Sequence, residues 1–284
     1  MNEESKATEQ LLFFQDGGRR SVDFALTFAD AEPLVPKIAC RLTGGCGNMT
    51  TADAIGMRNL EQALCGFTKG GGPRRHFAGF GIFGGTRMIS PIDPTIVIPG
   101  ITEIFPNVVK HCPGADTLGI VAGFRRFSRS QEPGLTDKLI LSRENNLLTI
   151  VHPDPRAVLL LQPTPDNDSV WDDEYKETQK CFTALHDLDW KTLNIVYNGG
   201  SVTEREIKLW AYLGRRQPGL WNMLLIKDSG RKASEYASNA EFLAQHPNIH
   251  VAENDVNAIN DKLWQLGVLV EKAQSKVIPF RKRA

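Results

Sequence analysis

Several features that define whole classes of protein are missing from this 284-residue chain. No uninterrupted apolar run reaches the ~18 residues that a membrane-spanning helix needs. The N-terminal segment MNEESKATEQ is polar and acidic, so it lacks the basic start and apolar centre of a secretory signal peptide. Neither sign of charge is in excess, because 33 Lys and Arg residues balance 33 Asp and Glu residues. These absences argue against a membrane or nucleic-acid partner, since a nucleic-acid partner usually requires a basic surface.

A cysteine pattern is also lacking. The five cysteines are odd in number and contain no CxxC spacing, and the six histidines show no metal-ligand spacing. Neither a disulfide framework nor a zinc site is therefore indicated. We expect reduced thiols, a cytoplasmic location, and a protein that uses neither a metal nor a cofactor. The rest of the composition is ordinary for a globular protein, with 41% hydrophobic residues in a chain long enough to bury a core.

Apolar strand patterns alternate with helical patterns along most of the chain, at roughly 25–35-residue spacing. Near-continuous apolar strands between helices indicate a parallel sheet that is covered on both faces. We therefore predict an α/β fold: a Rossmann-like, doubly wound, mainly parallel sheet with a β-rich N-terminal edge and a β-hairpin insertion. Helices are predicted over 51–64, 168–188, 202–216, 231–245 and 255–274.

The predicted organisation has one main domain and two flanking segments. Residues 1–35 form a β-hairpin extension that turns at Asp16-Gly17-Gly18, between two apolar runs. Residues 36–275 form the single Rossmann-like domain, and 276–284 form a basic tail. Within the domain, an insertion at about 125–165 contains a second hairpin, which we expect to turn at Asn145-Asn146.

Four glycine-containing loops follow predicted strands, and each is expected to precede a helix. In an open α/β sheet, ligands bind beyond the carboxyl ends of the strands. Glycines let backbone N–H groups approach an anion, and the helix dipole favours negative charge there. The loops therefore suit a small molecule that carries phosphate. The candidate ligand-binding residues are Thr43, Gly44, Gly45, Gly47 and Asn48; Gly84, Gly85, Thr86 and Arg87; Asn198, Gly199, Gly200, Ser201 and Thr203; and Asp228, Ser229, Gly230 and Arg231.

Each of these residues also has a purely structural explanation. A glycine loop after a strand is common turn chemistry, and none of the four matches the P-loop or opens a helix with GxGxxG. Glu206 is either a base or ribose ligand, or a carboxylate placed favourably near a helix N-terminus. Asn198 either binds a ribose or base edge or makes an Asx turn. Arg87 either clamps a phosphate or is simply exposed, and 228–231 either bind ligand or cap a helix.

The segment NGGSVTERE, residues 198–206, resembles the PGGxGTxxE motif of the LOG (Lonely Guy) phosphoribohydrolases. Asn198 replaces the proline of that motif, and Val202 replaces its third glycine. The resemblance implies Glu206 as the catalytic candidate. The matching positions are Gly199, Gly200, Thr203 and Glu206.

Two other segments resemble the nucleotide-sensing SLOG domain of TRPM channels and its free-standing prokaryotic relatives. They are PKIACRLTGGCGNM, residues 36–49, and LLIKDSGRKASEYASN, residues 224–239. With the first motif, the resemblance spans roughly residues 36–270. It implies a Rossmann-like fold that binds nucleotides or compounds of the ADP-ribose or NAD type, and that self-associates through helices beside the site.

This superfamily contains both enzymes and sensors, and the chain departs from the enzymes at one point. LOG enzymes, which this chain resembles, share an arginine on the helix before the PGG motif, and that arginine partners the motif glutamate. The corresponding helix here has no arginine, and Lys176 and Lys180 do not substitute for one at a bidentate site. We therefore expect a protein that senses a nucleotide-derived molecule and forms a homo-oligomer, with an effector protein as a further partner. The alternatives are a LOG-like nucleoside 5′-monophosphate phosphoribohydrolase and an assembly module with a degenerate pocket.

Overall fold

The computed structural model describes the chain in a series of segments, and the C-terminal segment is by far the longest of them. All statements of structure below refer to these residues. The described residues are 12–15, 37–45, 51–68, 75–84, 87–89, 97–98, 100–101, 104–112, 115–122, 127–129, 138–143, 146–151, 158–161 and 172–271.

The centre of the molecule is an eight-stranded sheet in which every neighbouring pair of strands is parallel. The predicted α/β, Rossmann-like fold is therefore confirmed. From one edge to the other, the strands are β1 (Leu12–Gln15), β11 (Val158–Leu161), β7 (Asp116–Ala122), β4 (Phe80–Phe83), β2 (Ile38–Gly45), β12 (Lys191–Asn198), β13 (Trp221–Ile226) and β14 (Ile249–Ala252).

The order of the strands shows where a ligand crevice belongs. From β2 the chain first builds outward through β4 and β7, and then returns to start again on the other side with β12, β13 and β14. The direction of winding therefore reverses between β2 and β12. In doubly wound sheets this reversal opens a crevice beyond the carboxyl ends of the two strands, because the helices that follow them leave on opposite faces.

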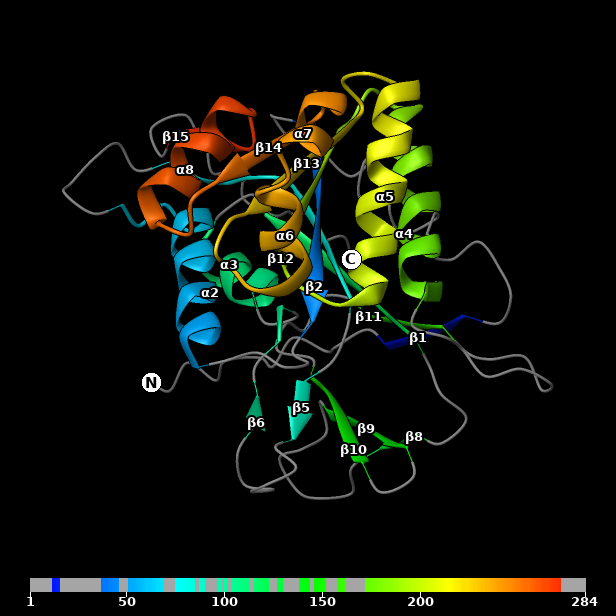
Figure 1. Cartoon of the computed structure of the whole chain (residues 1–284). Helices are drawn as coiled ribbons and strands as arrows, with labels where there is room; N and C mark the ends of the chain where they lie inside the picture. Colours follow the sequence, from blue (N-terminus) through cyan, green and yellow to red (C-terminus); the bar gives the residue numbers. More distant parts are fainter. Residues whose placement is uncertain are drawn as a thin grey trace, which may run out of the picture.

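Helices cover both faces of the sheet, with a hydrophobic cluster under each layer (Figure 1). Side chains alternate along a strand, so Ile38, Cys40 and Leu42 of β2 face one layer while Ala39 faces the other. The first layer contains α2 (Thr51–Leu64), α3 (Ile104–His111) and α8 (Val256–Gln265). The second layer contains α4 (Asp172–His186), α5 (Ser201–Arg216) and α6 (Arg231–Ala237), with α7 (Ala240–Gln245) beside α6.

A second sheet has five strands and is antiparallel throughout. In Figure 1 it lies on the side toward which β2 points. The hairpin predicted in the insertion is present, but its turn is one residue earlier than expected, because Asn146 already pairs with Arg143. The strands in order are β6 (Val97–Ile98), β5 (Arg87–Ile89), β10 (Asn146–Val151), β9 (Lys138–Arg143) and β8 (Phe127–Arg129).

Two helix predictions were wrong in extent. The segment 231–245 forms two helices, because the Asn239 side chain accepts a hydrogen bond from Phe242 N and starts α7 as a new helix. The segment 255–274 is helical only to Gln265. Gly267 then adopts a φ of 73°, and β15 (Leu269–Glu271) pairs antiparallel with β3 (Arg75–Phe77).

Parts of the predicted organisation lie at or beyond the limits of the described residues. Strand β1, from the predicted N-terminal extension, pairs in parallel with β11 at the edge of the main sheet. The turn at 16–18, its second strand and the tail 276–284 lie outside the described residues. Within the described part of the chain, no helix combines the length and apolarity needed to cross a bilayer.

Candidate functional site

The ends of three central strands are joined at the point where the winding of the sheet reverses. Asn198, the last residue of β12, donates from Nδ2 to the Gly45 carbonyl oxygen of β2 at 3.1 Å. Its backbone N–H donates to Ser229 Oγ, just after β13, at 3.1 Å. Lys232 N donates to the Gly199 carbonyl oxygen at 3.3 Å. We call the joined residues the loop cluster: Gly45, Asn198, Gly199, Gly200, Ser229, Gly230 and Arg231.

The backbone of the loop cluster and its neighbours is conformationally unusual. Asn198, Asp228 and Arg231 have φ values of 58°, 55° and 40°, in the left-handed region that L residues rarely occupy. Among the described residues the other non-glycine example is Asp189. Strain of this kind persists where the surrounding structure enforces it, and it tends to gather at ligand sites. Asn and Asp adopt this region more readily than other L residues, so Arg231 is the most unusual of the three positions, all of which lie beside the reversal point of the sheet.

The spacing of the Gly-Gly-x-x-Thr-x-x-Glu motif follows from how α5 packs. Gly199 has a φ of 93°, and a Cβ there would overlap the side chain of Thr203 in the first turn of the helix. Glu206 comes three residues after Thr203, and both side chains are buried on the inward face of α5. The Thr and Glu of the motif therefore have packing roles, whatever else they do.

The N-terminus of α5 has the features of an anion site. Its N-cap residue is Gly200, which has no side chain to cap the helix. The first-turn N–H groups of a helix lack intrahelical partners and carry partial positive charge. The Arg231 guanidinium lies alongside, because a Cβ on Gly200 would stand 2.8 Å from Arg231 Nη2. A fixed cation and uncapped N–H groups at one position favour a phosphate or carboxylate.

Tyr197 holds the start of α2 beside the loop cluster. Tyr197 Oη donates to the Asp53 carbonyl oxygen at 2.7 Å and accepts from Asn254 Nδ2 at 3.1 Å. Burial raises the pKa of Tyr197 to about 12, so the hydroxyl keeps its proton for this bond. The consequence is that Asp53, in the first turn of α2, lies next to Gly230 of the loop cluster. Sequence analysis did not single out Asp53, because an acidic residue in a first turn is common.

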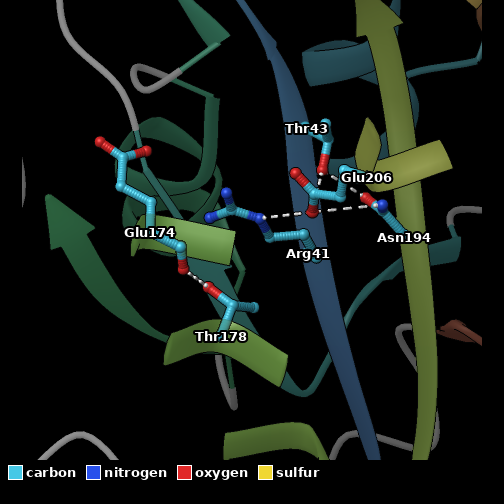
Figure 2. Close-up of polar contacts among 6 residues, drawn as sticks. All are labelled: Arg41, Thr43, Glu174, Thr178, Asn194 and Glu206. Carbon is cyan, nitrogen blue, oxygen red and sulfur yellow. Dashed lines mark hydrogen bonds and ion pairs between the residues drawn. The ribbon is translucent and has the colours of Figure 1, made fainter. Parts of the chain in front are cut away.

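Glu206 of α5 belongs to a buried polar group between that helix and strands β2 and β12 (Figure 2). We call this group the buried cluster: Arg41, Thr43, Asn194 and Glu206. Arg41 Nε donates to Glu206 Oε1 at 3.1 Å, and Asn194 Nδ2 is 3.4 Å from the same oxygen. The Thr43 hydroxyl lies 2.7 Å from that oxygen and from Asn194 Oδ1, so its single proton serves one of them at a time. Glu206 is 2% exposed, and thus α5 is tied to β2 and β12 by one buried carboxylate.

The arginine that pairs with Glu206 comes from strand β2. Strand pairing sets Arg41 of β2 beside Asn194 of β12, and both face the α5 side of the sheet. Arg41 Nη1 is buried without a hydrogen-bond partner in the described part of the chain, and it lies 3.0 Å from where a Cβ on Gly84 would stand. The Glu174 carboxylate of α4 is near that same position. Figure 2 shows the guanidinium between the side chains of Glu206 and Glu174.

The predicted site residues divide between these two clusters, and several cannot be placed. Thr43 belongs to the buried cluster, while Gly44 is packed against the Tyr197 carbonyl oxygen. Ser229 is fully buried, and its hydroxyl donates to the Ile226 carbonyl oxygen at 2.6 Å. Ser201 is the exposed first residue of α5, and Asp228 is also exposed. Gly47, Asn48, Gly85 and Thr86 lie outside the described residues.

One of the four loops does not lead where we expected. The segment after Gly84 was predicted to precede a helix, but Arg87 begins β5, which pairs with β10 in the second sheet. The Arg87 side chain lies outside the described part of the structure. Glycines after a strand suit a sharp turn into a new strand as well as a helix start, so the pattern alone does not separate the two.

The described cysteines offer no activated nucleophile. Cys40, Cys65, Cys112 and Cys181 are free thiols. Burial raises the pKa of Cys40, and a hydrogen bond with Cys112 together with burial raises that of Cys65. The raised pKa values of Cys40 and Cys65 keep these two thiols protonated and unreactive at neutral pH.

No protein-family model matches the chain, and no curated protein matches it either.

Proposed function

We propose that this chain is a SLOG-type binding domain for a nucleotide-derived small molecule, such as an ADP-ribose or NAD-type compound. The ligand's phosphate would occupy the N-terminus of α5. The observation that carries the proposal is the loop cluster at the reversal point of a Rossmann-like sheet. There an uncapped 16-residue helix, flanking glycines and the Arg231 guanidinium meet at one position.

The contacts of Glu206 favour binding over catalysis. Three donors from β2 and β12 converge on Oε1, and the side chain is buried. A general base must come within hydrogen-bond reach of the group that it deprotonates. A carboxylate that already joins three elements beneath the sheet is better suited to hold those elements together. In this proposal Glu206 is therefore a structural residue.

One observation favours a LOG-like phosphoribohydrolase as a second candidate. The ion pair between Arg41 and Glu206 provides, from a strand, the type of partner that those enzymes carry on a helix. Arg41 Nη1 would then be available to a substrate anion near Gly84. In this case the chain would release a free base from a nucleoside 5′-monophosphate.

One incubation separates these candidates. Purified protein is mixed with AMP, NAD or ADP-ribose, retained ligand is read by native mass spectrometry, and products are read by chromatography. We expect retained, unaltered ligand. Release of free base would support the hydrolase, and the absence of any retained ligand or product would contradict both candidates.

A matched pair of arginine variants tests the anion site itself. Arg231→Gln removes the cation beside the α5 N-terminus, whereas Arg215→Gln removes one from the last turn of the same helix. A charge-assisted hydrogen bond is stronger than a neutral one, so we expect Arg231→Gln to weaken binding about 10-fold or more. Arg215→Gln should leave it unchanged. Equal effects of the two changes would mean that only net charge matters.

The homo-oligomer and the effector protein remain predictions. The native masses of the purified protein test the first of them.

A further inference from the structure

The side chain of Asn198 has one polar atom without a partner. The residue is 0% exposed. Its Nδ2 donates to the Gly45 carbonyl oxygen, which fixes the orientation of the amide because a carbonyl accepts only from the nitrogen. Oδ1 then faces the other way, and it is buried with no hydrogen-bond partner among the residues that the structure describes. A buried acceptor without a donor is unfavourable, so its persistence points to a donor that arrives from outside the chain.

The surroundings of this oxygen show what kind of group would arrive. Gly230 has a φ of 95°, and a Cβ on it would stand 3.2 Å from Asn198 Oδ1 and 3.2 Å from Asp53 Oδ1. Two acceptor oxygens from different elements therefore face the space that the missing side chain leaves. On the β2 side, a Cβ on Gly45 would meet no atom of the described residues within 4 Å.

The charge at this position is the opposite of that at the start of α5. Asp53 provides a carboxylate and Asn198 a carbonyl oxygen, so the position accepts hydrogen bonds and repels phosphate oxygens. The uncapped α5 N-terminus and Arg231 favour an anion. Both positions adjoin Asn198-Gly199-Gly200. A ligand that fits both must join an anionic group to neutral hydrogen-bond donors over a short distance.

We propose that Asn198 Oδ1 and the Asp53 carboxylate form a hydroxyl-recognising subsite that binds the vicinal hydroxyls of a ribose. This inference rests on the proposed function, and it adds which residues recognise the ribose hydroxyls of the nucleotide-derived ligand. A carboxylate beside an amide oxygen suits two adjacent hydroxyl donors, whereas a ligand that lacks the hydroxyl facing Asn198 leaves Oδ1 unpaired. The subsite therefore discriminates ribonucleotides from deoxyribonucleotides.

The experiment compares AMP, 2′-deoxy-AMP, 3′-deoxy-AMP and inorganic pyrophosphate by isothermal titration calorimetry. We expect wild-type protein to bind at least one deoxy analogue about 10-fold more weakly than AMP, as the loss of one buried hydrogen bond requires. Pyrophosphate tests the anion position alone. These four ligands separate the phosphate contribution from the hydroxyl contribution within a single protein.

Two variants locate the discrimination. Asn198→Gly removes the amide and tolerates the left-handed backbone, and Asp53→Ala removes the carboxylate from the other side. We expect the preference for AMP over the deoxy analogue to fall toward onefold in each, with pyrophosphate binding kept. The control is Asn222→Ala, which removes an asparagine that bonds the Gly219 carbonyl oxygen away from the site and should change nothing. If Asn198→Gly fails to fold, Asp53→Ala carries the test.

The outcomes separate this inference from the proposed function. Wild-type protein that binds AMP and both deoxy analogues equally would overturn the subsite and leave nucleotide binding intact. A preference for AMP that persists in both variants would also overturn it, because the hydroxyls would then be read elsewhere. Protein that binds neither AMP nor pyrophosphate would overturn the proposed function, and the subsite with it.

Discussion

The buried cluster and the loop cluster lie along the same two strands, β2 and β12, and they differ in kind. In the buried cluster, three donors converge on Glu206 Oε1, and none of its four residues has a positive φ. In the loop cluster, Asn198 and Arg231 are left-handed, and Asn198 Oδ1 is buried without a donor among the described residues. Each cluster therefore leaves one polar atom without a partner there: the buried cluster leaves a donor, Arg41 Nη1, and the loop cluster leaves an acceptor, Asn198 Oδ1. The Glu206 carboxylate is satisfied within the protein, and we therefore assign it to the fold, whereas we assign Asn198 Oδ1 to the ligand.

The largest effect we predict comes from removing the carboxylate of the buried cluster. Glu206→Ala leaves the Arg41 guanidinium buried and unpaired, which typically costs about 3–5 kcal/mol. Urea denaturation followed by circular dichroism measures the free energy of unfolding. The control is Glu204→Ala, which changes a half-buried carboxylate on the same helix whose partners reach solvent, and it should cost far less. If Glu206→Ala is as stable as wild type and loses only ligand binding, Glu206 belongs with the ligand site instead.

A glycine pair separates backbone strain from close packing in the loop cluster. Gly199 and Gly219 have φ values of 93° and 86°, but only Gly199 faces a side chain, that of Thr203. We predict that Gly219→Ala costs about 1 kcal/mol from strain alone, and that Gly199→Ala costs about 2 kcal/mol or more. Thermal unfolding of the two variants makes the comparison. Equal costs would show that α5 does not require close approach of the chain at Gly199.

Tyr197→Phe tests whether the start of α2 supports the ligand site. The change removes the donor to the Asp53 carbonyl oxygen and the acceptor for Asn254 Nδ2. We predict a loss of about 1–2 kcal/mol in the free energy of unfolding. AMP should also bind more weakly, because Asp53 is no longer held beside Gly230. Calorimetry on folded variant protein measures the affinity for AMP. An unchanged affinity would show that holding Asp53 beside Gly230 does not contribute to AMP binding.

The smallest effect concerns pH and the exposed face of α5. Hydrogen bonds from Lys208 and Tyr236 lower the pKa of Glu204 to about 2. A carboxyl group whose pKa is lowered on folding adds stability above its unfolded pKa and loses it as the pH falls through the folded value. The stability gap between wild type and Glu204→Gln should therefore be constant at neutral pH and shrink from about pH 4.5 toward pH 2. A gap that widens on acidification would contradict these contacts.

Periodic patterns predicted the frame of the molecule well, because burial on both faces leaves a strong signal in each strand. The helix predicted over 51–64 matches α2 at both ends, and that over 202–216 starts one residue late. The glycine-rich strand ends were also found, and at Gly199 and Gly230 the positive φ explains why glycine is there. Patterns within a single segment therefore predicted where most strands and helices lie.

The site residues that sequence analysis missed depend on which distant segments become neighbours in the fold. Arg41 sits in the apolar run KIACRL, and its partner Glu206 is 165 positions away in sequence. Only the pairing of β2 with β12 brings them together. Asp53 was overlooked for the same reason, because Tyr197 and Gly230 meet it across the fold. A sequence shows which residues can form a site, but contacts between distant segments decide which of them do.

Hydrogen–deuterium exchange of wild-type protein, with and without AMP, tests the central claim most directly. The account predicts that AMP slows exchange at the amides of 199–203, at the start of α5, and around Asp53 in the first turn of α2. Amides of β2 and β12 beside the buried cluster should exchange at the same slow rate in both samples. Protection confined to the neighbourhood of Arg41 and Glu206, or its complete absence from 199–203, would contradict the assignment of binding to the loop cluster.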